Sequence, residues 1–256
     1  MKVQEVMESA RLKVSRANRH IDEINADQSA LPMRLYDLGV THRSVALLRE
    51  PDCDLVTYIP KQSISKHFGA IAGDVVNNLR ESMDVWINTA VRCVGPVKKL
   101  HFPFSEERQN LEASGNFRNV EKAFPDAADF ISKKIEPCRN TNLYLWAATS
   151  LCNANKHNDF IPVVGLSQIK GKNIQIGSVN IGELAASGDA NKPQTLICAP
   201  YKGFYIEDDF KATVEVSFPK GAVFEDQLIV PTLVKMSDVV TETLDALEVF
   251  IRPYCK

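Results

Sequence analysis

The sequence lacks a long apolar run, and this absence argues against a membrane protein. No stretch approaches the roughly 20 apolar residues that a transmembrane helix needs. The first residues, Met1 to Glu5, open a pattern interspersed with charges, and they lack the basic start and unbroken apolar segment of a secretory signal peptide. We therefore predict a cytoplasmic protein that does not contact a membrane.

Clustered cysteines are also absent. The six cysteines stand singly, without a CxxC pair or the Cys/His spacing of a zinc site. They are Cys53, Cys93, Cys138, Cys152, Cys198 and Cys255. A chain of 256 residues with a full core does not need cross-links, so we predict free thiols rather than three disulfides. We predict no metal and no cofactor.

The sequence has no excess of charge and none of several common catalytic motifs. A net charge of -2 and a pI near 6.2 give no overall attraction to nucleic acid, so RNA binding would need a local basic patch. The chain has no phosphate-binding glycine loop, no GxSxG motif and no HExxH motif. P-loop hydrolases, serine hydrolases of the elbow type and zincins are therefore unsupported.

What the sequence does contain is enough apolar material for a core, arranged with the periodicity of helices. Hydrophobic residues make up 45% of the chain and charged residues 24%. Apolar residues spaced three and four apart, together with capping and proline signals, predict helices. The predicted helices cover residues 3–27, 70–93, 118–135, 141–157 and 237–252. The last is predicted to begin at a Ser237-Asp238 cap.

Short β-branched segments predict strands. In the N-terminal part, Val45 to Leu48 and Leu55 to Tyr58 flank a turn-like Glu50-Pro51-Asp52 and predict a small hairpin. After Phe160, segments punctuated by Gly, Pro and Asp predict an antiparallel sheet. They are residues 161–164, 174–181, 195–198, 213–218 and 228–234.

Together these elements predict an α+β fold. We expect a single composite domain over residues 1–256, with a helical core at about 64–160, a β-rich part at about 161–236 and a C-terminal helix at about 237–252. Helices 70–93 and 141–157 would pack as a central antiparallel pair. The first and last helices would flank this pair, and the hairpin and C-terminal sheet would cover one side.

Polar residues concentrate beside the apolar stripes of this helical pair. Asn77, Arg80 and Asp84 lie along one flank of helix 70–93, three and four residues apart. Asn153 and His157 lie four apart on helix 141–157, with Lys156 on its wetter side. We take Arg80, Asp84 and His157 as candidate catalytic residues, and Asn77, Asn153 and Lys156 as candidate substrate-binding residues. Asp84 is the expected partner of Arg80 when no substrate is bound.

The same polar segments resemble an uncharacterised group of bacterial proteins. The helices of that group read roughly GDxxHNLRxxLDHxxW and LxxLxNxDKHR, with an FPI-like segment between them. Here the corresponding stretches are Gly73 to Trp86, Phe102-Pro103-Phe104 and Asn153 to Asn158. The N-terminal helix and the β-rich C-terminal part are also similar, so the resemblance covers most of the chain, but it implies no particular activity.

The Arg-x4-His pattern of that group is in turn similar to the signature of HEPN domains, many of which are metal-independent ribonucleases. In that chemistry an arginine stabilises the phosphorane and a histidine moves protons. This sequence departs from the pattern, because Val85 stands five residues after Arg80 and Asn77 replaces the earlier histidine of the group. If the pattern is catalytic, His157 has to replace the missing acid and base.

Two hypotheses follow. The first is a HEPN-like protein that binds or cleaves RNA in bacterial stress or phage defence, as a monomer or a homo-oligomer, with Arg80 on the phosphate. The second is a non-catalytic protein-interaction module in which Arg80, Asp84, Asn153 and His157 form a structural polar network.

Overall fold

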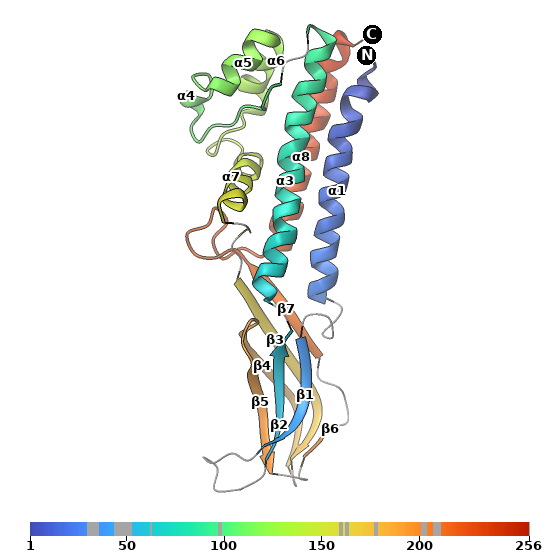
Figure 1. Cartoon of the computed structure of the whole chain (residues 1–256), viewed down its shortest axis with the longest axis vertical. Helices are drawn as coiled ribbons and strands as arrows, with labels where there is room; N and C mark the ends of the chain where they lie inside the picture. The colour runs from blue at the N-terminus through green and yellow to red at the C-terminus, as the bar shows by residue number, and fades with distance from the viewer. Residues whose placement is uncertain are drawn as a thin grey trace.

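The molecule is elongated, with helices at one end and strands at the other (Figure 1). The computed structural model describes residues 1–256 except 30–35, 44–52, 62, 97–98, 159–160, 162–163, 177–178, 201–203, 207–210 and 256. Both chain termini lie together at the helical end (Figure 1). The predicted α+β class is confirmed.

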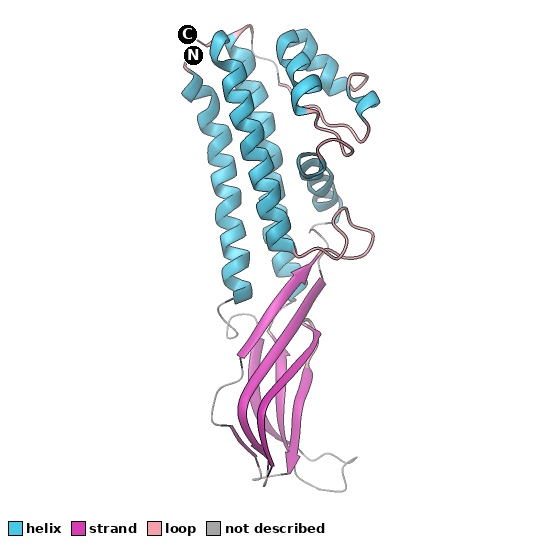
Figure 2. Cartoon of the chain, turned by 180° about the vertical axis from the view of Figure 1, so that it is seen from behind, coloured by secondary structure: helices cyan, strands magenta, loops and turns pink. Residues whose placement is uncertain are grey.

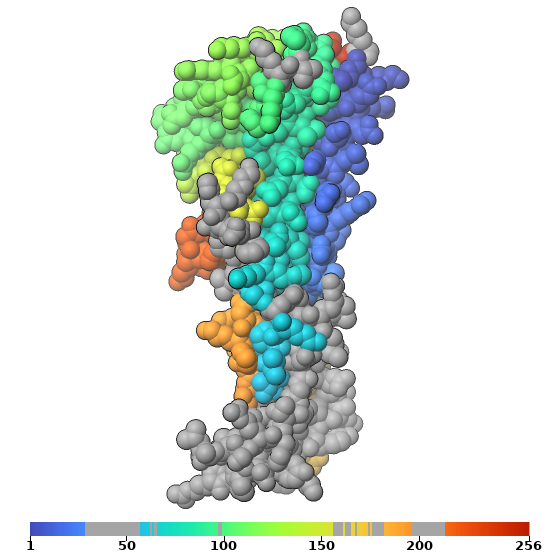
Figure 3. Space-filling model, viewed as in Figure 1, coloured from blue at the N-terminus to red at the C-terminus, as the bar shows by residue number. Residues whose placement is uncertain are grey.

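Three long helices run side by side along the long axis of the molecule: α1 (Val3–Ser29), α3 (Ile64–Ala90) and α8 (Ile229–Ile251). Each contributes an apolar stripe to a common core, as the three- and four-residue spacing predicts. The space-filling view shows α1 and α3 in contact along the length of one face (Figure 3), and both helices also pack against α8. Among the described helices, none combines the length and the apolar character needed to cross a bilayer.

The shorter helices pack beside this bundle. They are α4 (Arg108–Leu111), α5 (Gly115–Ala123), α6 (Pro125–Phe130), a π-helical turn (Ile131–Ile135) and α7 (Leu143–Asn158). The predicted single helix 118–135 is therefore divided, because Pro125 lacks an N–H group and restricts Phe124, whose φ is −153°. Asn142 caps α7, since its Oδ1 accepts a hydrogen bond from Leu145 N at 3.3 Å.

The boundaries of two long helices differ from the prediction. Helix α3 begins at Ile64, more than one turn before its predicted start at residue 70, because the Ser63 side chain caps it. Helix α8 begins at Ile229, so the predicted strand 228–234 and the predicted Ser237 cap are wrong. Leu233 and Met236 are buried and continue the apolar stripe of the helix toward its start, and this packing outweighs the strand preference of β-branched residues.

Two antiparallel sheets form the other end of the molecule (Figure 2). Strands β1 (Tyr36–Arg43), β2 (Cys53–Pro60) and β5 (Gln194–Pro200) make the first sheet. In the second, β3 (Val164–Ile176) pairs with β4 (Val179–Asp189) on one side and with β6 (Phe204–Ile206) and β7 (Lys211–Ser217) on the other.

The N-terminal hairpin is present, but its first strand is β1 and not residues 45–48, which lie outside the described residues. The segment 174–181, predicted as one strand, spans the end of β3 and the start of β4. Strand β5 comes from the C-terminal half and pairs with β2, so the β-rich part includes residues 36–60 as well as residues after 161. Val214, Val216 and Phe218 are buried on one face, as the alternation predicts.

The sheets extend from the end of the helical bundle instead of covering its side (Figures 1 and 2). The chain passes between the helical and β regions four times, after α1, β2, α7 and β7. The predicted contact between helices 70–93 and 141–157 is present, because α7 packs against α3. Since α3 also packs against α1 and α8, it is the central helix of the bundle.

Candidate functional site

A cleft of about 470 Å³ lies where α3, α5, α7 and the segment after α3 come together. Four of the six predicted site residues line it: Asn77, Arg80, Asp84 and Asn153. The other lining residues are Glu81, His101, Asn116, Thr149 and Cys152. These four side chains, which come from both polar helices, therefore line one cleft.

The close approach of α7 to α3 depends on Gly73. A Cβ atom on Gly73 would overlap the side-chain amide of Asn155, so with any other residue at position 73 that side chain would have to move. The Asn155 Oδ1 atom is buried there and has no hydrogen-bond partner among the described residues.

Arg80 is held on three sides. Its Nε donates a hydrogen bond to Thr149 Oγ1 at 2.7 Å, and its guanidinium carbon lies 4.7 Å from the ring centre of Phe104. Its Nη1 forms the predicted ion pair with Asp84. That Nη1 atom is buried, and its contact with Asp84 does not have the geometry of a hydrogen bond. With only 13% of its side chain exposed, Arg80 joins α3 to α7 more than it faces solvent.

Asp84 connects Arg80 to the segment that follows α3. Its Oδ1 accepts a hydrogen bond from the backbone N–H of Phe102 at 2.7 Å, and its Oδ2 lies 3.1 Å from His101 Nδ1. One carboxylate therefore contacts an arginine, a backbone amide and a histidine. This arrangement satisfies a charge that is only 23% exposed.

Asn88 extends the same connection by one helical turn. Its Nδ2 donates to the carbonyl of Leu100 at 2.6 Å, and its Oδ1 accepts from the Leu100 N–H at 2.8 Å. Asn88 and Asp84 thus fix residues 100–102 along α3. Phe102 is fully buried and contacts Trp86 edge to face, so this segment packs on the core.

Asn77 has a different partner in the cleft. Its Oδ1 accepts a hydrogen bond from the buried Cys152 Sγ at 3.0 Å, which adds a second link between α3 and α7. Asn153, one residue further along α7, is exposed at the mouth of the cleft.

The structure does not place the remaining two predicted site residues in the cleft. Lys156 and His157 belong to the last turn of α7, but their side chains lie outside the described part of the structure. A histidine that lines the cleft is His101, which helical spacing does not predict because it lies in the segment after α3. The signal for it is the Gly95-Pro96 turn, which lets the chain double back along α3.

The charges of the cleft do not favour a polyanion. Arg80 is the only arginine or lysine among the described residues that line it, and it is paired with Asp84. The second carboxylate, Glu81, forms an ion pair with Lys13 of α1 at 2.5 Å. Among the described residues, no group of three or more His, Cys, Asp or Glu side chains is placed to hold a metal ion.

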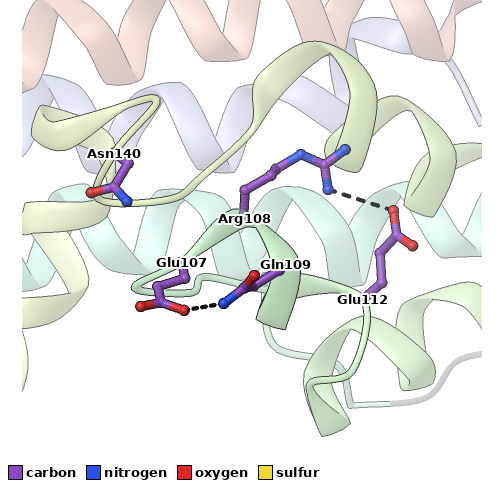
Figure 4. A pocket seen from close by; sticks show the side chains of 5 residues that line it. All are labelled: Glu107, Arg108, Gln109, Glu112 and Asn140. Atoms are coloured by element: carbon purple, nitrogen blue, oxygen red, sulfur yellow. Dashed lines mark hydrogen bonds and ion pairs between the residues drawn. The ribbon is translucent and has the colours of Figure 1, made fainter.

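A second and more open hollow lies beside α4 (Figure 4). It is lined by Glu107, Arg108, Gln109, Glu112 and Asn140. Arg108 is paired with Glu112 at 3.5 Å, and Gln109 donates a hydrogen bond to Glu107 at 2.6 Å. Its described side chains include no nucleophile and no histidine. It is therefore a weaker candidate for a functional site than the cleft between α3 and α7.

Comparison of the chain with models of protein families, with characterised proteins and with solved structures found no match. The geometry of the cleft therefore carries the functional argument.

Proposed function

We propose that this chain is a non-catalytic interaction protein whose polar cluster is a structural network. The cluster consists of Arg80, Asp84, Asn88 and Thr149. The observation that supports this proposal is the bonding of Asp84, which contacts Arg80 and His101 and accepts a hydrogen bond from the backbone of Phe102. These contacts hold α3, α7 and residues 100–102 in one arrangement.

The state of Arg80 supports the same conclusion. Two of its three guanidinium nitrogens are already engaged, Nε by Thr149 and Nη1 by Asp84, so a phosphate would have to compete with the Asp84 carboxylate for this charge. RNA binding also draws on several cationic contacts to phosphates. The cleft offers one such arginine, and it is already neutralised.

Metal-independent RNA cleavage is the second candidate, and the position of His101 favours it. Both Arg80 and His101 contact Asp84, and the His101 ring is 51% exposed. Because Nδ1 faces the carboxylate, Nε2 is left to take a proton from a ribose 2′-hydroxyl as that oxygen attacks phosphorus. The phosphorus–O5′ bond would then break, and His101 would return the proton to the leaving 5′-oxygen. Arg80 would stabilise the phosphorane, and His101 rather than His157 would be the proton carrier.

Incubation with total RNA in EDTA separates the two candidates. The proteins are the parent chain, Arg80→Ala, His101→Ala, and His20→Ala as a control histidine on α1, each with a melting curve. The structural proposal predicts no cleavage by any of them and a lower melting temperature for Arg80→Ala.

Cleavage by the parent and His20→Ala, lost in His101→Ala at an unchanged melting temperature, would contradict the structural proposal and establish the ribonuclease. A contaminating nuclease would persist in every preparation, including His101→Ala, and His20→Ala controls for the general effect of removing a histidine.

A further inference from the structure

Two cysteines that are far apart in sequence meet at the helical end of the molecule. Cys93 lies in the 3₁₀ turn Val91–Cys93 that follows α3, and Cys255 follows the 3₁₀ turn Arg252–Tyr254 at the end of α8. Their Sγ atoms are 3.1 Å apart, although the residues are 162 positions apart along the chain. Both are free thiols and both are partly exposed.

The chain segment that carries Cys255 is held in place by its neighbours. Tyr254 packs edge to face on Phe124, with ring centres 4.9 Å apart, and its hydroxyl donates a hydrogen bond to Asp126 at 2.8 Å. Phe250 stacks on Phe130 with ring centres 4.6 Å apart. The two sulfurs therefore lie together because α8 packs against α3, while α8 and the turn after it are also held by residues of and next to α6.

We propose that Cys93 and Cys255 form a redox-sensitive pair that closes an intramolecular disulfide when the folded protein meets a disulfide oxidant such as oxidised glutathione. A disulfide bond is about 2.0 Å long, so the two sulfurs need to approach by only about 1 Å. The bond would link the C-terminal ends of α3 and α8. The other two described cysteines, Cys138 and Cys152, are buried and have no such neighbour.

The order of the exchange follows from the environment of Cys93. Burial, together with the hydrogen bond to Cys255, raises the pKa of the Cys93 thiol to about 12. Burial therefore disfavours the Cys93 thiolate, and we take Cys255 as the sulfur that gives up its proton to solvent and attacks oxidised glutathione first. This step gives a mixed disulfide on Cys255 and releases one glutathione thiolate.

Cys93 completes the reaction in a second step. Burial, the largest cause of the raised pKa of Cys93, remains in the mixed disulfide, but the hydrogen bond and charge of the Cys255 thiol no longer add to it. Cys93 then loses its proton to solvent and attacks the Cys255 sulfur, releasing the second glutathione. The protein gives up two electrons, and one oxidised glutathione becomes two reduced molecules.

The test is oxidation of the folded, full-length chain with oxidised glutathione, followed by blocking of free thiols and non-reducing peptide mapping. We expect one linked peptide pair containing Cys93 and Cys255, and a melting temperature raised by roughly 5 °C or more. Neither Cys93→Ser nor Cys255→Ser should give the linked peptide or the raised melting temperature. The control Cys138→Ser should give the linked peptide and the raised melting temperature. Using two variants keeps the test valid if one fails to fold.

The proposal is overturned if both cysteines stay reduced, or carry separate glutathiones, in folded protein under conditions that fully oxidise dithiothreitol. It is also overturned if the linked peptide forms only after unfolding in urea. A rate of formation that rises with pH is expected, because thiolates are the attacking species.

Discussion

Asp84 Oδ1 accepts a hydrogen bond from the backbone N–H of Phe102 at 2.7 Å, across 18 positions of sequence. This bond joins the middle of α3 to the segment that doubles back along it after the turn at residues 95–96. It also explains why Asp84 is not simply a surface partner of Arg80, since an ion pair between exposed residues of one helix would leave the Phe102 amide unsatisfied.

Replacement of Asp84 by alanine should destabilise the protein by about 2 to 3 kcal/mol, because a buried amide and the Arg80 charge both lose a partner. Urea unfolding monitored by circular dichroism measures this. The matched control is Asp129→Ala, since Asp129 is 60% exposed and pairs with the exposed Lys133 on the helical surface. That change should cost less than about 0.5 kcal/mol. Equal costs for the two changes would mean that Asp84 has no special structural role.

The contact between Gly73 and Asn155 predicts that the effect of Gly73→Ala on the free energy of unfolding changes sign when Asn155 is also replaced. Gly73→Ala in the parent should destabilise by roughly 1 to 2 kcal/mol, because the added methyl group overlaps the Asn155 side chain. In an Asn155→Ala background the overlap is gone, and the same change should stabilise by roughly 0.5 to 1 kcal/mol through helix propensity. Unfolding free energies of the two single variants and the double variant measure the coupling. Additive effects would show that the two residues do not meet.

Tyr58 predicts a dependence of stability on alkaline pH. It is fully buried in β2, and its hydroxyl donates a hydrogen bond to the carbonyl of Ala190 at 2.7 Å. Burial, and to a lesser extent the Asp189 carboxylate, raise the pKa of this phenol well above its ordinary value. The folded state thus keeps the proton more tightly than the unfolded chain. Its contribution is complete below about pH 10 and is lost as the pH rises further.

Tyr58→Phe tests this assignment. The variant should be about 1 to 2 kcal/mol less stable near neutral pH because it lacks the hydrogen bond. Between about pH 9 and pH 11, its urea midpoint should fall less than that of the parent, since the other titrating groups are common to both. Parallel pH profiles for parent and variant would refute the assignment to Tyr58.

The long helices follow from the sequence because each buries a regular stripe along most of its length. The errors lie where local signals compete with packing. Residues 229–234 have the β-branched composition of a strand, yet Ile229 and Leu233 are buried as the first turns of α8. The pairing of β2 with β5 joins segments more than a hundred residues apart, and no local pattern specifies such a partner.

In the candidate site too, spacing within one helix is predictable from the sequence, whereas contacts between separate segments are not. Helical spacing is enough to place Asn77, Arg80 and Asp84 together, since residues three and four apart share a face. The proximity of His101 and Thr149 depends on how a loop and a second helix pack, which spacing within one helix does not determine. The hydrogen bond from Arg80 to Thr149 is therefore a property of the fold and not of either segment.

The most direct test of a structural network is the unfolding free energy of Arg80→Ala in urea, with Arg19→Ala on the exposed face of α1 as the matched loss of an arginine. Arg80 joins Thr149 of α7 to Asp84 of α3, so we predict a loss of about 2 to 4 kcal/mol for Arg80→Ala and less than about 0.5 kcal/mol for Arg19→Ala. An Arg80→Ala protein as stable as the parent, or more stable, would contradict the account, because it would mark Arg80 as a residue kept for function at the expense of stability.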